Sequence, residues 1–256
     1  MSAQKKSTSF GRAASAYESG RPGYSAEAVS WMLEHARESG RVPRVADVGA
    51  GTGKLTRAVV ELGADVVAVD PDADMLASLR ENVVGVPTFV GTAETLPLPD
   101  AALDAVVMGQ AWHWVDPVLG SREVARVLRP GGVLGLVWNI RDDRVEWVRR
   151  LTDAMGMANA ERFIADGGPE LAEPFGALEH RAWEWQWLVT LPQLRDLVAS
   201  RSDVITADAE RRARIDAAVD EVVASVPGLA DGKTVAMPYV THAFRARTPS
   251  GASAAG

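Results

Sequence analysis

The sequence predicts a doubly wound α/β fold built on a mostly parallel sheet. Short apolar runs that are typical of strands alternate with helical patterns over residues 25–140, and glycines follow the first run. Such alternation implies right-handed βαβ crossovers and a sheet covered on both faces. We expect one domain at 25–248 with a helical insertion around 141–175 that caps the substrate site, preceded by an arm at 1–24 and followed by a flexible tail at 249–256.

The first half of the chain predicts nine elements in strict order. Ser25 and Asp116 are suited to be helix N-caps, Gly63 ends a helix, and Pro71 and Pro117 are suited to first helical positions. The expected helices cover 25–39, 55–62, 71 to about 82, and 117 to about 128. The expected strands cover 44–50, 65–70, 87–91, 103–109 and 133–140.

The second half of the chain shows a different pattern. Trp183, Trp185 and Trp187 alternate with Glu184 and Gln186, and this period of two predicts a half-solvated, antiparallel strand near the end of the sheet. Its expected partner is 235–247, and helical patterns cover 191–200 and 207–226.

Composition excludes several classes of protein. The 256 residues include 27 Lys and Arg against 34 Asp and Glu, a formal charge of −7, which disfavours a general nucleic-acid binder. No apolar run approaches the ~20 residues that cross a membrane. The absence of cysteine excludes disulfides and thiolate chemistry. The arm is locally basic and Ser-rich, which leaves a targeting segment as an alternative, with the cytoplasm as the default location.

A glycine turn follows the first expected strand, where doubly wound sheets bind ligands. Gly49, Gly51 and Gly53 allow a tight turn and a close approach of a ligand to the backbone. Lys54 stands where the dinucleotide fingerprint requires a third glycine, which weakens a nicotinamide site. Leu55 stands where a phosphate-binding Walker loop requires Ser or Thr.

Asp70 ends the second expected strand, 17 residues after Gly53. A carboxylate there can accept both hydroxyls of a ribose, and it would repel a 2′-phosphate. The glycine turn and Asp70 together therefore favour an adenosine-containing ligand. The alternative is a turn without a ligand, in which Asp70 only caps the following helix.

Several motifs together resemble class I S-adenosylmethionine-dependent methyltransferases, in the group of the quinone C-methyltransferases and trans-aconitate methyltransferases. The similarity covers about residues 10–140, and it implies a seven-stranded sheet with one antiparallel strand near the edge. The motifs are DVGAGTG at 47–53, Asp70-Pro71, GTAE at 91–94 with LPLPD at 96–100, and LRPGG at 128–132.

The resemblance also implies roles for individual residues toward S-adenosylmethionine. The glycine turn would pass under the amino-acid part, Asp70 would bind the ribose, Ala93 and Glu94 would lie beside the adenine, and Gln110 would contact the methionine end. Tyr17, Arg21, Pro22 and Tyr24 resemble a segment that folds over the cofactor, although Tyr17 and Arg21 could also be a helix-packing pair. The implied cofactor contacts are Tyr17, Arg21, Asp47, Gly49, Gly51, Thr52, Gly53, Asp70, Pro71, Ala93, Glu94 and Gln110, and Tyr24 would contact the substrate.

The stretch 110–114, QAWHW, lies at the expected mouth of the substrate site. His113 could be a general base, because imidazole titrates near neutrality, or it could only order the loop. Trp112 and Trp114 are expected to line an apolar pocket because a loop carries them, whereas Trp138 is expected in the core.

The leading hypothesis is a methyltransferase that uses S-adenosylmethionine, without a metal, to methylate a small, partly apolar molecule. Aligning a nucleophile behind the methyl carbon can lower a barrier by about 7–11 kcal/mol without an activated protein nucleophile. An NAD-dependent oxidoreductase and a non-enzymatic partner-binding module are the alternatives. The acceptor atom and the oligomeric state stay open.

Overall fold

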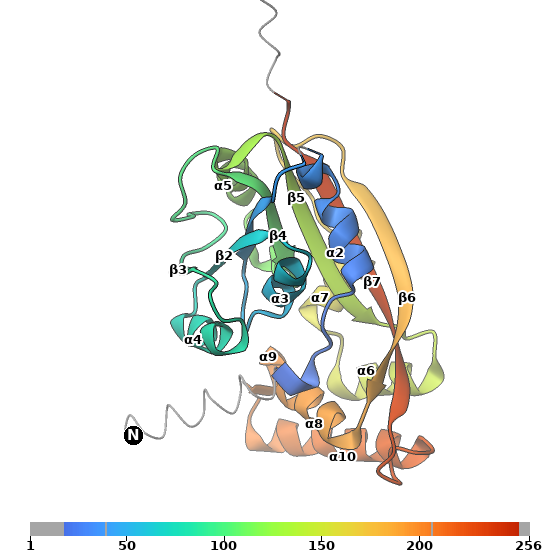
Figure 1. Cartoon of the computed structure of the whole chain (residues 1–256). Coiled ribbons are helices and arrows are strands. Elements are labelled where there is room, and N and C mark those ends of the chain that lie inside the picture. Colours follow the sequence, from blue (N-terminus) through green and yellow to red (C-terminus); the bar gives the residue numbers. More distant parts are fainter. Residues whose placement is uncertain (1–17, 39, 206, 251–256) are drawn as a thin grey trace, which may run out of the picture. The chain divides into compact units, whose positions relative to one another are not determined.

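The computed structural model describes residues 18–38, 40–205 and 207–250 (Figure 1). Its seven strands form one mixed sheet in the order β3-β2-β1-β4-β5-β7-β6, which is the α/β architecture that the sequence predicts. The strands are β1 Arg44–Val48, β2 Asp65–Asp70, β3 Thr88–Val90, β4 Leu103–Gly109, β5 Leu128–Arg141, β6 Glu179–Val189 and β7 Val235–Arg247.

Helices connect the strands and extend the second half of the chain. The α-helices are α2 Ala26–Leu33, α3 Lys54–Glu61, α4 Ala73–Asn82, α5 Pro117–Val127, α6 Glu146–Met155, α7 Asn159–Ala165, α8 Leu191–Ala199, α9 Ser202–Ile205 and α10 Ala209–Ser225. Two 3₁₀ turns lie at His35–Arg37 and Trp112–Trp114.

The strands from β3 to β5 are parallel, and β7 reverses the direction. Val45 of β1 pairs in parallel register with Val66 of β2 and Ala105 of β4. The Thr248 amide after β7 donates to the Gly132 carbonyl near the start of β5, at 3.0 Å. Because the end of β7 meets the start of β5, these two strands are antiparallel (Figure 1).

The tryptophan-rich strand β6 is the edge strand beyond β7. Arg245 near the end of β7 donates to Glu179 at the start of β6, and Trp185 stacks on Tyr239 with ring centroids 5.3 Å apart. The pair is therefore antiparallel, as the sequence predicts. The strand that runs opposite to the others is β7. The tryptophan-rich strand β6 is antiparallel to β7 and therefore has the same direction as β1 to β5.

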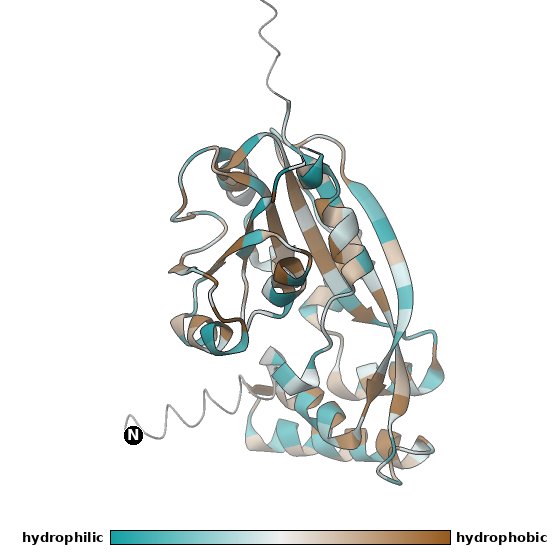
Figure 2. Ribbon diagram, in the orientation of Figure 1, coloured by the Kyte–Doolittle hydropathy of each residue, from teal (hydrophilic) through white to brown (hydrophobic). Residues whose placement is uncertain are grey.

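The chain divides into two compact units. We call residues 139–162 and 184–240, with the described residues before Gly23, the helical unit, and residues 23–138, 163–183 and 241–250 the sheet unit. In the sheet unit, α2 and α3 share a core with β1, β4 and β5. In the helical unit, α6, α8 and α10 share a core with residues of β6 and β7. Figure 2 shows apolar residues concentrated along the central strands.

Capping side chains fix most helix starts where the sequence predicts them. Ser25 accepts the Ala28 amide, and Asp116 caps the helix whose first residue is Pro117. The prediction for Pro71 is wrong, because α4 begins two residues later with Asp72 as its N-cap. Asp72 starts the helix because its carboxylate accepts amides of the first turn. The side chain of proline has no acceptor atom for such hydrogen bonds.

Candidate functional site

The three glycines of the turn after β1 have different surroundings. Gly49, Gly51 and Gly53 have φ of +71°, +55° and +91°, a region that favours glycine. A Cβ at Gly49 would lie 2.6 Å from the Ala111 Cβ, and one at Gly53 would lie 2.9 Å from the Leu79 Cγ. A Cβ at Gly51 would have no described atom within 4 Å. Two glycines thus allow close packing within the protein, and Gly51 borders open space.

Asp70 connects the glycine turn to the end of β2. Its Oδ2 accepts the Gly51 amide and its Oδ1 accepts the Asp72 amide, each at 2.8 Å. The side chain is buried, and burial raises its carboxyl pKa. An ionised carboxylate has about four acceptor positions, so two remain for ligand hydroxyls. Asp70 accepts no amide from within α4, whose cap is Asp72, so helix capping does not explain it.

Asp47 lies fully buried beneath the turn. Its Oδ2 accepts the Thr56 hydroxyl at 2.6 Å, and its Oδ1 has no hydrogen-bond partner among the residues that the structure describes. Burial raises the pKa of Asp47 to about 7, and the negative charge of Asp70 acts in the same direction. A buried acceptor without a donor costs free energy, so this oxygen suits a donor supplied by a ligand or by water.

The end of β4 lies against the glycine turn through the contact of Ala111 with Gly49. Gln110 has φ of +56°, and its amide donates to the Val137 carbonyl at 2.9 Å. A non-glycine residue in this region stores backbone strain, which is common at binding sites. A Cβ at Gly109 would lie 2.6 Å from the Tyr24 hydroxyl, so Tyr24 reaches the same strand end.

The other predicted cofactor contacts of the sheet unit lie in different environments. Ala93 is buried, and Glu94 accepts the Asp116 amide at 3.0 Å, which links its loop to α5. Thr52 is buried in the turn and its carbonyl accepts the Asn82 side chain. Pro71 is exposed directly after Asp70.

His113 is held by aromatic side chains. The Trp138 indole nitrogen donates to His113 Nδ1 at 3.3 Å. Ring centroids of Trp114 and Phe163 lie 4.9 and 5.9 Å from the imidazole. Because an indole N–H can only donate, Nδ1 is the acceptor and the proton of the neutral ring is on Nε2. Burial lowers the pKa of His113 to about 4, so the ring is neutral at physiological pH.

The two loop tryptophans have opposite environments. Trp112 is 2% exposed and its indole donates to the Glu170 carbonyl at 3.2 Å, so it supports the loop from the core. Trp114 is 65% exposed beside His113. Trp138 is fully buried, which confirms its prediction as a core residue.

The predicted arm is only partly described. Tyr17 lies outside the described residues. Arg21 belongs to the helical unit, where its Nε donates to the Ser200 hydroxyl at 3.1 Å. Its role toward the cofactor stays a prediction.

The partners of His113 and Asp47 were not predicted from the sequence. Val137 pairs with Gly109 in the register of β4 and β5, and this places Trp138 beside the loop that carries His113. That neighbourhood could have been inferred from the predicted parallel order. Phe163 comes from the insertion and carries no signal in the sequence.

Within residues 18–38, 40–205 and 207–250, no three or more His, Asp or Glu side chains form a group that could hold a metal ion. In the same part of the chain, no helix is long and apolar enough to cross a membrane.

A family model described as a methyltransferase domain matches residues 46–136, which contain the glycine turn, Asp70 and His113. An uncharacterised methyltransferase of Mycobacterium tuberculosis is 48% identical over 245 residues, covering 94% of this chain and 96% of that one. A methyltransferase-like protein of Schizosaccharomyces pombe is 31% identical over 233 residues, covering 89% and 91%.

The fold is also found among solved structures. One from Anaeromyxobacter dehalogenans, assigned as a type II methyltransferase, aligns with a TM-score of 0.64 at 22% identity, covering 90% of this chain and 99% of that one. At this identity the structural match shows the fold alone, whereas the mycobacterial relative matches nearly the whole chain. The chain therefore belongs to the methyltransferase family and is an enzyme of that type.

Proposed function

We propose that this enzyme takes its methyl group from S-adenosylmethionine, bound at the ends of β1, β2 and β4, and transfers it to a small, partly apolar acceptor. One observation carries the proposal. The turn opens to space at Gly51, the same residue whose amide is fixed by the Asp70 carboxylate.

The residues at this end of the sheet unit fit the chemical parts of that cofactor. Asp70 keeps acceptor capacity for ribose hydroxyls, and Gly51 has no side chain to obstruct a ligand. The second oxygen of Asp47 suits a donor such as an amino group, directly or through a water. Ala93 and Glu94 are proposed for the adenine, and Gln110 for the methionine end.

Bound S-adenosylmethionine supplies an electrophilic methyl group on a sulfonium. The protein then has to orient the acceptor and exclude water, which alone can account for a large part of the rate. Trp114 has an exposed aromatic face against which the acceptor can be oriented. Aromatic faces also attract cations such as the sulfonium. Tyr24 lies at the same strand end and is proposed as a substrate contact.

We assign His113 a role as a hydrogen-bond donor. Its Nδ1 lone pair accepts the Trp138 indole, so the ring has no second lone pair with which to remove a proton. The low pKa makes protonation still less favourable. The neutral ring holds its proton at Nε2 and donates it in a hydrogen bond, which orients an oxygen of the acceptor.

Two titrations test the proposal. Calorimetry with S-adenosylhomocysteine should show binding in the micromolar range, and a fluorescence titration with NADH should show none. The absence of S-adenosylhomocysteine binding by folded protein, or tighter binding of NADH, would overturn it.

A further inference from the structure

Asp47 is the most deeply buried acid of the proposed cofactor site, with a relative exposure of 0%. Its partners in the sheet register are apolar, Ala68 of β2 and Val107 of β4. The Thr56 hydroxyl of α3 donates to its Oδ2 at 2.6 Å, whereas Oδ1 has no hydrogen-bond partner among the residues that the structure describes. The donors to this carboxyl thus come from one uncharged residue, Thr56.

A second carboxyl, that of Asp70, acts on Asp47 from the end of β2. Burial raises the pKa of Asp47 to about 7, and the negative charge of Asp70 acts in the same direction. Asp70 itself accepts the amides of Gly51 and Asp72, which favour its ionised form. Of these two acids, Asp47 therefore retains its proton up to the higher pH.

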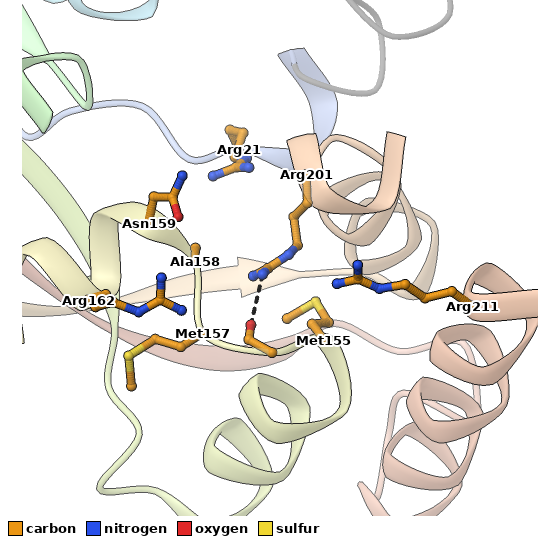
Figure 3. A pocket seen from close by; sticks show the side chains of 9 residues that line it. Arg21, Met155, Met157, Ala158, Asn159, Arg162, Arg201 and Arg211 are labelled. Atoms are coloured by element: carbon orange, nitrogen blue, oxygen red, sulfur yellow. Dashed lines mark hydrogen bonds between the residues drawn. The ribbon is translucent and has the colours of Figure 1, made fainter. Parts of the chain in front are cut away.

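Other buried charged side chains have partners that suit their charge. Asp104 accepts the Arg129 guanidinium at 2.5 Å. Burial raises the pKa of the Asp104 carboxyl, but its hydrogen bonds and nearby cations outweigh burial and lower the pKa overall. Arg201 in the helical unit donates to the Gly156 carbonyl at 2.7 Å, a bond drawn in Figure 3. Among the described residues, the groups that act on Asp47 include no cation, so the free energy cost of burying its charge is avoided by holding a proton.

The cofactor of the proposed function would bring the missing positive charge. Its amino-acid part carries an ammonium group near neutral pH, and that part is proposed to pass over the turn beneath which Asp47 lies. An ammonium beside a buried carboxyl favours the ionised form of the carboxyl. We propose that binding of the cofactor or its demethylated product expels the proton of Asp47, so that one proton leaves the site for each ligand that enters it.

The exchange balances in atoms and charge. The carboxylic acid of Asp47 becomes a carboxylate that pairs with the ligand ammonium, directly or through one water, and the proton passes to the solvent. Because protonated Asp47 must lose its proton before it can pair, acid weakens binding. The association constant should rise by up to about tenfold per pH unit below pH 7 and level off above it. This inference rests on the proposed function.

Protons released on binding can be counted by calorimetry on the full chain. Titrations with S-adenosylhomocysteine at pH 6.5 in phosphate and in Bis-Tris, which differ in ionisation enthalpy, should show release of more than about half a proton per ligand. The matched ligand is 5′-methylthioadenosine, which has the nucleoside and the thioether without the amino-acid part. It should bind without proton release, although it also reaches Asp70.

The comparison of the two ligands decides the proposal on the unmodified protein. Equal release with both ligands would assign the proton to a group at the nucleoside, such as Asp70, and would overturn the proposal. Binding of S-adenosylhomocysteine without any release would also overturn it.

Asp47→Asn tests the assignment to one residue, because the amide keeps the size of the side chain and does not titrate. The folded variant should bind S-adenosylhomocysteine without proton release, and its affinity should change less than about twofold between pH 5.5 and 7. Asp74→Asn, at an exposed position of α4, is the control and should release protons as the wild type does. Release that persists in folded Asp47→Asn would prove the assignment wrong.

The proton count also separates this inference from the proposed function. If folded protein binds no S-adenosylhomocysteine at any pH between 5.5 and 8, the proposed function fails and this inference fails with it. If the ligand binds and no proton is released, the cofactor site stands and only the role of Asp47 is wrong.

Discussion

The Gly51 amide donates to the Asp70 carboxylate at 2.8 Å, which ties the turn after β1 to the end of β2. This bond fixes the carboxylate without using its full acceptor capacity. The proposed ribose contact is therefore positioned before any ligand binds, which lowers the entropy lost on binding.

Asp70→Asn should weaken S-adenosylhomocysteine binding by about 1.5–3 kcal/mol, roughly 10- to 150-fold, because charged hydrogen bonds to the ligand are lost. Calorimetry measures this. Asp74→Asn, at an exposed position of α4, is the control and should bind as the wild type does. Equal affinity of Asp70→Asn and the wild type would remove Asp70 from the site.

Gly51→Ala separates backbone strain from the obstruction of a ligand. Gly51 and Gly63 both have positive φ, and a Cβ at either would have no described atom within 4 Å. Both alanine variants should lose about 1–2 kcal/mol of stability from the left-handed conformation. Denaturant titrations measure the stability of both variants, and calorimetry measures how they bind S-adenosylhomocysteine. Only Gly51→Ala should lose that binding. Normal binding by Gly51→Ala would contradict the open turn as a ligand site.

The buried carboxyl of Asp47 predicts a pH dependence of stability. Its folded pKa of about 7 exceeds the unfolded value of about 3.9, so between these values the folded state holds more protons. The free energy of unfolding of the wild type minus that of Asp47→Asn should therefore fall as the pH rises from 5 toward about 7, and then level off. Denaturant titrations at each pH measure this, and a difference that rises or stays constant would be evidence against a buried protonated Asp47.

The imidazole of His113 should stay neutral with its proton on Nε2 in the folded protein. Its pKa of about 4 predicts that ¹⁵N shifts of this ring do not change between pH 5.5 and 8, whereas histidines of the urea-unfolded chain titrate near 6.5. Nδ1 should show the shift of an unprotonated nitrogen. A ring that titrates near neutrality would restore the general-base hypothesis.

The donor role of His113 also predicts a difference between two variants. Gln places an amide N–H near the position of Nε2, whereas Phe keeps the ring volume and removes the donor. Once an acceptor is known, His113→Gln should keep more activity than His113→Phe in a methyl-transfer assay. A general base would lose activity equally in both variants.

The sheet was predictable because local patterns determine it. The bounds of β2, β4 and β7 match their predicted ranges. For β2 the signal is an apolar run between two acidic residues, and for β4 it is an apolar run that ends at a glycine. Pro71 was misplaced because the proline rule and the Asp72 cap compete, and capping hydrogen bonds decide the helix start.

The site was predictable only where its residues lie at the ends of predicted strands. The glycine turn and Asp70 lie at consecutive strand ends, so their proximity follows from the topology. Trp112 could not be assigned to the core from its loop position, because its burial depends on Gly120 and Glu170. The arm at 1–24 as a lid stays a prediction.

A crystal structure of the chain with S-adenosylhomocysteine would show directly whether the cofactor binds at these strand ends. We expect ribose hydroxyls on the Asp70 carboxylate, the amino-acid part over Gly51, and the sulfur at the end of β4 near Gln110. A ligand bound away from these strand ends, or a nucleoside with no contact to Asp70, would contradict this expectation.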